Sequence, residues 1–197
     1  MTVGGVVLAA GRSSRFGSPK ALANLDGRPL LEHVLDIAAA AGLDPVVVVL
    51  GDAAEAVEPA ISWRRERRVR NPDPARGLSS SVRLGLDTLA EIDAAADAVI
   101  LPGDQPRADP SVIRRLVDVA AATDRPIVAP RYAGGGGPNP VLLRRAGFGL
   151  AEATEGDRGL GPLLEALPHL VAWVDVEGSN PDVDTPADLT ALPPSRD

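Results

Sequence analysis

Short apolar runs alternate with segments of helical periodicity along the whole chain. Each run has the length of a strand and stops at a glycine, a proline or a polar turn. The run at 45–50 is dominated by β-branched residues without polar alternation, which is typical of a strand covered on both faces. We predict strands at 6–10, 45–50, 67–70, 98–101, 126–130 and 170–176.

Between these runs, apolar residues recur every three or four positions, as they do on the buried face of a helix. The stripe at 30–38 has Pro29 before it and Gly42 after it, which are common start and stop residues. Asp109-Pro110 is expected to cap a further helix. We predict helices at 30–38, 52–60, 79–91, 110–120 and 186–192, and a loop and helix within 156–167.

Strands that alternate with helices in this order predict a mostly parallel sheet, covered on both faces and joined by right-handed crossovers. A chain of 197 residues is long enough to bury roughly 70% of its unfolded surface. We therefore expect a single domain over residues 1–192 and a frayed tail over 193–197. In sheets of this kind, ligands bind at the carboxyl ends of the strands.

The segment that follows the first predicted strand has the composition of a phosphate site. Small residues let backbone N–H groups approach an anion, while Arg15 and Lys20 supply positive charge. The spacing excludes a Walker loop, since five residues separate Gly11 from Gly17, and no Gly-x-Gly-x-x-Gly fingerprint is present. The alternative is a solvated turn that is merely basic. The segment reads Gly11-Arg12-Ser13-Ser14-Arg15-Phe16-Gly17-Ser18-Pro19-Lys20.

Two acidic turns are candidates for binding a divalent cation. Asp104 follows an apolar strand, and Mg²⁺ bridging to a ligand phosphate would give its carboxylate a partner. Asp184 could supply the second carboxylate, because Mg²⁺ often takes one or two carboxylates together with phosphate oxygens and water. Asp104 could instead be an ordinary turn residue. Asp184 or Thr185 could simply cap the helix that Pro186 opens.

Two further polar segments admit both a functional and a structural interpretation. Hydroxyl and N–H groups at the helix start 77–82 could hydrogen-bond a nucleobase edge or a phosphate. Ser79 or Ser80 could equally be an ordinary helix cap. The glycine run at 134–137 could be a lid over a substrate or a plain connector.

Composition narrows the possible functions. The net charge of -7 provides no overall field for nucleic acid or an anionic membrane, and aromatic residues make up only 3%. The absence of cysteine excludes disulfides and thiolate metal sites and fits a reducing cytoplasm. The apolar run at 6–10 is too short for a signal peptide, and we interpret His33 and His169 as structural. We expect a cytoplasmic protein with small-molecule partners, binding neither nucleic acid nor membrane.

Six segments that span most of the chain also occur together, and in this order, in one protein family. They are Leu8–Lys20, Gly77–Leu86, Gly103–Pro106, Asn139–Leu142, Gly156–Gly159 and Asp184–Leu189. The first resembles the Leu-Ala-Ala-Gly-x-Ser-x-Arg-Met-Gly-x-x-Lys signature of the MobA-like nucleotidyltransferases, most closely the molybdenum cofactor cytidylyltransferase branch. Phe16 stands where methionine is usual, and Gly137-Pro138 precedes Asn139 where a Gly-His or Gly-Asn pair is common.

The resemblance implies a three-layer α/β/α Rossmann-like nucleotidyltransferase fold and a Mg²⁺-dependent transferase. Ala9-Ala10-Gly11 is similar to the CTP-using branch, which implies transfer of CMP from CTP to the phosphate of the molybdenum (molybdopterin) cofactor with release of pyrophosphate. The molybdoenzyme that receives the cofactor is a possible partner. Alternatives are GTP-dependent guanylyl transfer, transfer to another small phosphate acceptor, and a nucleotide-binding protein that delivers the cofactor without catalysis.

The family's functional residues match positions of this sequence. The resemblance implies catalytic roles for Arg15, Lys20 and Asp104, and metal binding by Asp104 and Asp184. Asn139 and Gly137 fall in the acceptor-binding region. The implied nucleotide-binding residues are Leu8, Ala9, Ala10, Gly11, Arg12, Ser13, Ser14, Arg15, Gly17, Lys20, Gly77, Ser81 and Asp104.

Overall fold

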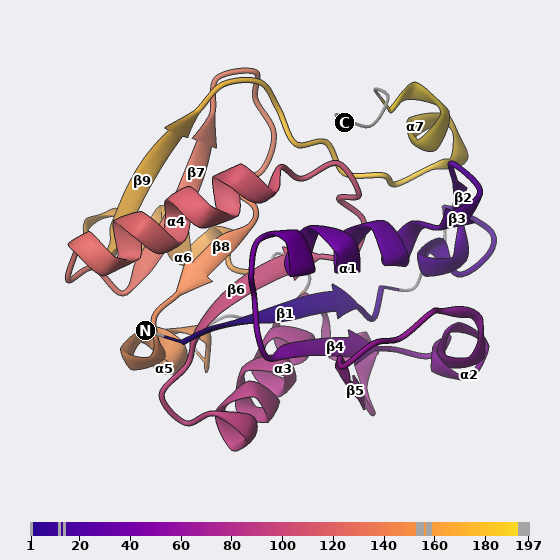
Figure 1. Ribbon diagram of the computed structural model, residues 1–197, viewed down its shortest axis with the longest axis horizontal. Helices are drawn as coiled ribbons and strands as arrows, with labels where there is room; N and C mark the ends of the chain where they lie inside the picture. The colour runs from indigo at the N-terminus through magenta and orange to yellow at the C-terminus, as the bar shows by residue number, and fades with distance from the viewer. Residues whose placement is uncertain (1, 12, 14, 153–155, 157–158, 193–197) are drawn as a thin grey trace.

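One seven-stranded sheet, in the order β5-β4-β1-β6-β8-β7-β9, carries the fold (Figure 1). The computed structural model describes residues 2–11, 13, 15–152, 156 and 159–192 of the chain, so the tail predicted at 193–197 lies outside the described residues. Each predicted strand is present. The strands are β1 (Val3–Ala9), β4 (Val46–Leu50), β5 (Arg67–Arg70), β6 (Asp97–Pro102), β7 (Ile127–Tyr132), β8 (Val141–Leu143) and β9 (Val171–Val176).

The sheet is parallel except at β8, which runs antiparallel to both β6 and β7. The prediction of a mostly parallel sheet is therefore confirmed. The sequence analysis does not predict β8 as a strand, because its few residues follow a segment rich in glycine and proline. In the central pair, Leu8 of β1 lies opposite Pro102 of β6, so the loops that follow these two strands leave the sheet at the same edge.

Helices cover both faces of the sheet and complete a three-layer α/β/α fold, as predicted. Those packed on one face are α1 (Leu30–Ala40), α2 (Ala54–Val57) and α4 (Pro110–Ala122), and those on the other are α3 (Leu78–Ile92), α5 (Phe148–Glu152) and α6 (Gly161–Ala166). Near the C-terminus lies α7 (Pro186–Ala191). Among the described residues, no helix combines the length and the apolarity needed to cross a membrane.

Short elements connect these layers. They are the strands β2 (Asn24–Leu25) and β3 (Arg28–Pro29) and the 3₁₀ helices η1 (Lys20–Leu22), η2 (Glu58–Ala60), η3 (Pro74–Arg76), η4 (Arg145–Gly147) and η6 (Pro168–Leu170).

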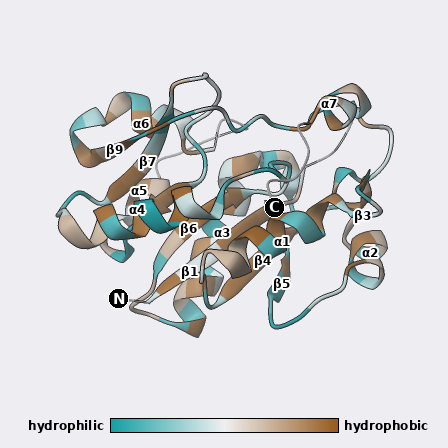
Figure 2. Cartoon of the chain, turned by 45° about the horizontal axis from the view of Figure 1, so that its top comes forward, coloured by the Kyte–Doolittle hydropathy of each residue, from teal (hydrophilic) through white to brown (hydrophobic). Residues whose placement is uncertain are grey.

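The residues of β1 show how one strand contributes to two cores. Side chains of a strand alternate between the faces of the sheet, and accordingly Val7 packs with Leu31 of α1 on one face. Val6 and Leu8 pack with Leu86 of α3 on the other face. Apolar colouring is concentrated on the central strands in Figure 2. The hydrophobic core therefore holds β1 rigidly between two helical layers and fixes where its following loop begins.

Two helix caps can be compared with their predictions. The Asp109 carboxylate accepts a hydrogen bond from the Ser111 N–H at 2.7 Å, which confirms the predicted cap of α4. At α7 the cap is Thr185, whose hydroxyl and the Asp188 carboxylate form a reciprocal capping box. Because Thr185 fills this position, the carboxylate of Asp184 is left for other contacts.

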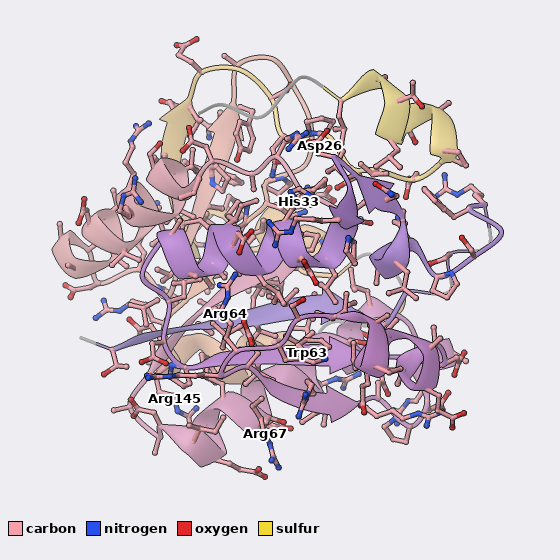
Figure 3. The ribbon with its side chains drawn as sticks, turned by 45° about the vertical axis from the view of Figure 1, so that its right-hand side comes forward. Asp26, His33, Trp63, Arg64, Arg67 and Arg145 are labelled. Atoms are coloured by element: carbon pink, nitrogen blue, oxygen red, sulfur yellow. The ribbon has the colours of Figure 1, made fainter. Side chains whose placement is uncertain are left out.

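The sequence analysis does not predict the small β2–β3 hairpin that precedes α1. Its tip is Asp26-Gly27, with φ angles of 52° and 83°, as a tight hairpin turn requires. His33 of α1 lies with its Nε2 atom 2.8 Å from the Leu25 carbonyl oxygen (Figure 3). This contact ties the helix to the hairpin and agrees with the structural interpretation of His33.

Close packing between α3 and β1 depends on Gly85. A Cβ atom there would collide with the Val6 side chain and lie 3.1 Å from Val49 Cγ2. We expect Gly85→Ala to lower the free energy of unfolding by about 1–3 kcal/mol, measured by urea denaturation, because overpacking a core forces side chains and backbone to shift. Gly149→Ala is the control, since a Cβ at this exposed helical position meets nothing within 4 Å. Equal stabilities of the Gly85 variant and the intact protein would contradict the packing argument.

Candidate functional site

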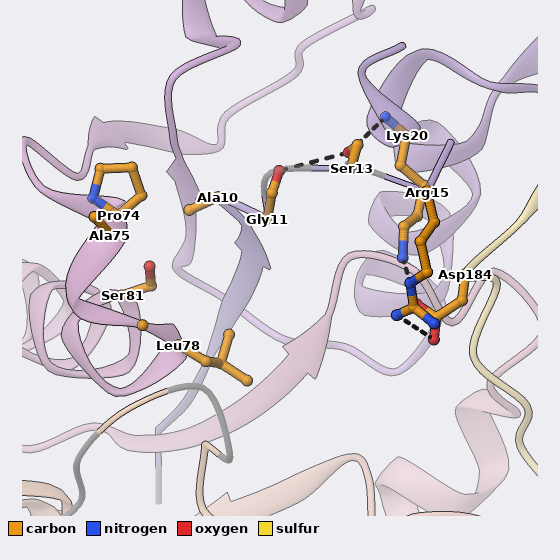
Figure 4. Close-up of a pocket in the computed structure, with 11 residues that line it drawn as sticks. Ala10, Gly11, Ser13, Arg15, Lys20, Pro74, Ala75, Leu78, Ser81 and Asp184 are labelled. Atoms are coloured by element: carbon orange, nitrogen blue, oxygen red, sulfur yellow. Dashed lines mark hydrogen bonds and ion pairs between the residues drawn. The ribbon is translucent and has the colours of Figure 1, made fainter. Parts of the chain in front are cut away.

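A pocket of about 360 Å³ opens at the carboxyl edge of the sheet (Figure 4). Loops that follow β1 and β5, the start of α3 and the turn before α7 form its walls. Its lining residues are Ala10, Gly11, Ser13, Arg15, Lys20, Pro74, Ala75, Gly77, Leu78, Ser81 and Asp184.

A second pocket of about 220 Å³ adjoins the first and shares several of its residues. It extends the site toward β6 and β8. Its lining residues are Leu8, Ala9, Gly11, Ser13, Lys20, Ala21, Leu78, Pro102, Gly103, Asp104, Asn139, Asp182 and Asp184. The two pockets together form one elongated site over the ends of the central strands.

Lys20 connects three distant parts of the chain at this site. Its Nζ atom donates hydrogen bonds to Asp104 Oδ2 at 2.9 Å and to Asp184 Oδ1 at 3.0 Å. Its backbone N–H donates to Ser13 Oγ at 3.0 Å, which fixes the loop around the lysine. Its side chain is only 16% exposed. The loop after β1 therefore contacts both of the acidic turns that were predicted from the sequence.

These contacts shift the pKa values of the charged groups. Burial lowers the pKa of Lys20, but the hydrogen bonds and charges of Asp104 and Asp184 outweigh it, so this pKa is raised above its usual value. The hydrogen bond from Lys20 is the main cause that lowers the pKa of Asp184. Both shifts favour the charged forms at neutral pH.

Arg15 is held much more loosely than Lys20. Its guanidinium lies 2.9 Å from Asp184 Oδ2, but its side chain is 68% exposed. Exposed ion pairs of this kind contribute little to stability. Arg15 can therefore leave Asp184 for an anionic ligand at small cost.

Among the described residues that line it, the opposite end of the first pocket, here called the uncharged end, has no charged side chain. The helix α3 begins after Gly77, whose φ is 92°, and no side chain caps it, so the alternative of an ordinary serine cap at Ser79 or Ser80 is wrong. Asn71, which follows β5, donates hydrogen bonds to Ser80 Oγ and Ser81 Oγ, both at 2.9 Å. Backbone groups and small side chains thus form this end, while charge is concentrated at the other.

A chain of hydrogen bonds through two buried amides supports the part of the second pocket that contains Asn139. Gln105 Nε2 donates to Asp182 Oδ1 at 2.7 Å, and Asn180 Nδ2 donates to Gln105 Oε1 at 2.9 Å. The Asn139 carbonyl accepts from Asn180 Nδ2 at 3.2 Å and from the Tyr132 hydroxyl at 3.1 Å. Burial raises the pKa of Tyr132 to about 12, so its hydroxyl remains a donor. The backbone of Asn139 is therefore fixed in the wall of the pocket that Asp104 also lines.

Most of the residues singled out in the sequence do meet at the two pockets, but some do not. Gly17 and Gly137 are not among the described residues that line either pocket. Arg12 and Ser14 lie outside the described residues. Pro74, Ala75 and Leu78 also line the pockets but are not singled out in the sequence, because none of them is charged. Asp182 lines the second pocket as well; it belongs to the same acidic turn as Asp184 but is not singled out as a site residue.

A larger cavity of about 670 Å³ lies between α1, α4 and the loop after β9. Two of its charged groups, Asp36 and Arg107, are already paired within the protein. Asp36 pairs with Arg28 and Arg64, and Arg107 pairs with Asp26. At the sheet edge, by contrast, Asp104 and Asp184 converge on the Lys20 ammonium, so the elongated site is the better candidate.

Asp104 and Asp184 are the carboxylates of this site that could hold a divalent cation. Both contact the same Lys20 ammonium, so both face a common point that attracts positive charge. Within the described residues, no group of three or more His, Asp or Glu side chains is arranged to hold a metal. A cation here would need oxygens from bound phosphate and water, which is how Mg²⁺ is often held. The residues present fit that arrangement.

A family model described as the MobA-like NTP transferase domain matches residues 5–171. The chain belongs to the MobA-like NTP transferase family. The resemblance seen in the sequence motifs is thereby confirmed at the level of the family.

Members of this family and solved structures extend the comparison. Nicotine blue oxidoreductase of Paenarthrobacter nicotinovorans is 33% identical over 198 residues, covering 93% of this chain and 92% of that protein. Rv0371c of Mycobacterium tuberculosis H37Rv is 36% identical, with a TM-score of 0.83 over 97% of this chain and 96% of that chain. A further structure of Rv0371c is a complex with manganese.

The bifunctional protein GlmU of Sorangium cellulosum strain So ce56 is similar over a shorter region. It is 39% identical over 134 residues, which are 64% of this chain but 27% of GlmU. The chain therefore spans about a quarter of the length of the GlmU proteins that it matches.

Replacing Lys20 tests the electrostatics of the site. In Lys20→Met the hydrogen bond to Asp184 is lost, so we expect the pKa of Asp184 to rise from its lowered value toward its ordinary one, although the Arg15 guanidinium still lowers it. Because the folded-state pKa is lowered, this carboxylate stabilises the fold above the unfolded pKa, and its contribution is lost as the pH falls through the folded value. Carboxyl NMR titration measures the midpoint, and Lys20→Arg, which keeps the charge, is the control. An unchanged Asp184 midpoint in Lys20→Met would contradict the assignment.

Proposed function

We propose that this protein transfers CMP from CTP to the phosphate of the molybdenum (molybdopterin) cofactor and releases pyrophosphate. The observation that carries the proposal is the division of the elongated site into a charged and an uncharged end. Lys20, Arg15 and Asp184 lie at one end and Ser81 at the other (Figure 4), and Asp104 contacts Lys20 at the charged end. A nucleoside triphosphate has the same division between its phosphates and its base.

Each part of the proposed reaction has a group of this chain to support it. The backbone of the loop after β1, with Arg15 and Lys20, would bind the triphosphate. Asp104 and Asp184 would hold Mg²⁺, which supplies positive charge at the phosphates when bound. The manganese complex of Rv0371c supports a divalent cation. Asn139, beside Asp104 in the second pocket, would contact the acceptor.

The transfer itself is a displacement at phosphorus. An oxygen of the acceptor phosphate forms a bond to the α-phosphorus, the bond from that phosphorus to the β-phosphate oxygen breaks, and pyrophosphate leaves with the electron pair. A phosphate monoester is largely ionised near neutral pH, with a second pKa of about 6, so no general base is needed. Neither His33 nor His169 is among the residues that line the two pockets. Alignment of the reactants and neutralisation of charge would account for the rate.

The choice of CTP and of the acceptor rests on the sequence resemblance. Ala9-Ala10-Gly11 is similar to the CTP-using branch, whereas the GTP-using relatives tend to have Leu-Ala-Gly-Gly. GTP and other small phosphate acceptors are therefore the alternatives to compare directly. A cytoplasmic location and delivery of the product to a molybdoenzyme complete the proposal.

A second candidate function follows from the name of one relative. Nicotine blue oxidoreductase is 33% identical over almost the whole chain, so an oxidoreductase that binds a nucleotide-containing redox cofactor in the same pocket is the rival. The intact Lys20–Asp104–Asp184 cluster favours the transferase, because phosphoryl chemistry uses these charges directly.

Product analysis with Asp104→Asn tests the proposal. We expect CTP, Mg²⁺ and the molybdenum (molybdopterin) cofactor to yield pyrophosphate and a cytidylylated product. The variant should be slower by about a hundredfold or more, since it loses a carboxylate that would hold the cation neutralising the reacting phosphates. Asp118→Asn, an exposed aspartate on α4, is the control.

The possible results separate the alternatives. Faster turnover with GTP or with another phosphate acceptor would change the assigned substrate but support the same type of reaction, nucleotidyl transfer. Tight CTP binding without pyrophosphate from any acceptor would indicate a delivery protein. Oxidation of a reduced nicotinamide or flavin cofactor, again without pyrophosphate, would favour the oxidoreductase.

A further inference from the structure

Asn71 is buried just behind the uncharged end of the first pocket and is not among its lining residues. We infer that Asn71 is a positioning residue that makes the Ser81 hydroxyl a hydrogen-bond donor toward a carbonyl or ring-nitrogen acceptor of the bound nucleobase. This inference rests on the proposed nucleotide site, though not on the identity of the acceptor or on catalysis.

All the hydrogen-bonding atoms of the Asn71 side chain have defined partners. Its Oδ1 atom accepts from the Asp73 N–H at 3.0 Å. An amide nitrogen has two protons, and they are donated to Ser80 Oγ and to Ser81 Oγ, each at 2.9 Å. The side chain is therefore fixed in one orientation, with its donors directed at the start of α3.

The hydrogen bonds of Ser80 limit which backbone carbonyl the Ser81 hydroxyl can reach. The Ser80 hydroxyl donates to the Gly77 carbonyl at 2.7 Å, and the Ser80 N–H donates to the same oxygen at 3.1 Å. A serine in a helix would ordinarily bond back to the carbonyl four residues earlier, which for Ser81 is Gly77. Because Ser80 already supplies two donors to that carbonyl, Ser81 has little access to it.

The oxygen of the Ser81 hydroxyl is engaged as an acceptor, so the hydroxyl can act toward a ligand as a donor. Its oxygen accepts from Asn71, and within the described part of the chain its own proton has no acceptor. Ser81 is 2% exposed and lines the pocket at the end opposite Lys20 and Arg15 (Figure 4). A pocket-lining hydroxyl with this proton uncommitted can donate to a base bound at this end, away from the charged groups that would bind phosphates. Nucleobase recognition then depends on Asn71 although Asn71 does not touch the ligand.

The substitution Asn71→Asp reverses this polarity at nearly constant shape. A carboxylate only accepts hydrogen bonds, so the Ser81 proton would turn toward residue 71 and a lone pair would face the base. We expect the Kd for CTP, measured by calorimetry, to rise about tenfold to a hundredfold, as for loss of a hydrogen bond that leaves an acceptor unpaired. Inorganic tripolyphosphate, which has no base, should bind the intact protein and the variant within about twofold of each other.

Two further variants keep the experiment decisive. Ser81→Ala removes the proposed donor outright and should weaken CTP binding to a similar extent without affecting tripolyphosphate. Ser80→Ala removes the hydroxyl that occupies the Gly77 carbonyl, so the Ser81 hydroxyl can bond back to it; CTP binding should weaken, while the Kd for tripolyphosphate stays within about twofold. Thermal melting of each variant shows that it is folded, and Ser81→Ala serves as the test if Asn71→Asp does not fold.

The outcomes separate this inference from the proposed function. Unchanged CTP affinity in Ser81→Ala, or equal weakening of CTP and tripolyphosphate in both variants, would overturn the role of Asn71 and Ser81. Selective loss of CTP binding in a protein that releases no pyrophosphate would support the inference while the proposed transferase reaction fails. If none of CTP, UTP, GTP and ATP binds the intact protein more tightly than tripolyphosphate does, base recognition itself is refuted.

Discussion

The site depends on one cation held between two carboxylates. Lys20 contacts Asp104 and Asp184, which are 84 and 164 residues away along the chain. Each carboxylate lies in a turn at the edge of the sheet, where without a positive charge the two would repel each other. The lysine therefore both joins the first and last parts of the fold and sets the charge that an incoming phosphate would meet.

The hydrophobic pattern was enough to predict the layers of the fold, because buried apolar residues recur at different spacings in strands and in helices. The β2–β3 hairpin was missed although its Asp26-Gly27 turn is a recognised signal, since two-residue strands carry no measurable alternation. The antiparallel direction of β8 could not be predicted either. Strand direction is decided by long-range pairing, which a local pattern does not contain.

The charged part of the candidate site could be predicted from the sequence, and the uncharged part could not. Arg15, Lys20, Asp104 and Asp184 are charged groups in polar turns, and the structure brings them together. The uncharged end is made by the backbone and by residues such as Leu78 and Pro74, which look like ordinary loop or helix residues. Such an end becomes visible only when α3 is placed against the loop after β1. The same limitation explains why a shared fold, also present in a relative named as an oxidoreductase, does not by itself identify the reaction.

The reversed direction of β8 has a consequence for how this scaffold can diversify. Because β8 is antiparallel to β7, the end of one strand and the start of the other lie at the same edge of the sheet, and the glycine-rich segment 133–138 bridges them there. Asn139 enters the site from this bridge, whereas Lys20 and Asp104 enter from the loops after β1 and β6. Insertions or deletions in the bridge would reshape one wall of the second pocket without altering the register of the central strands. The fold thus separates a wall of the pocket that can change in length from the parallel strands that position Lys20 and Asp104.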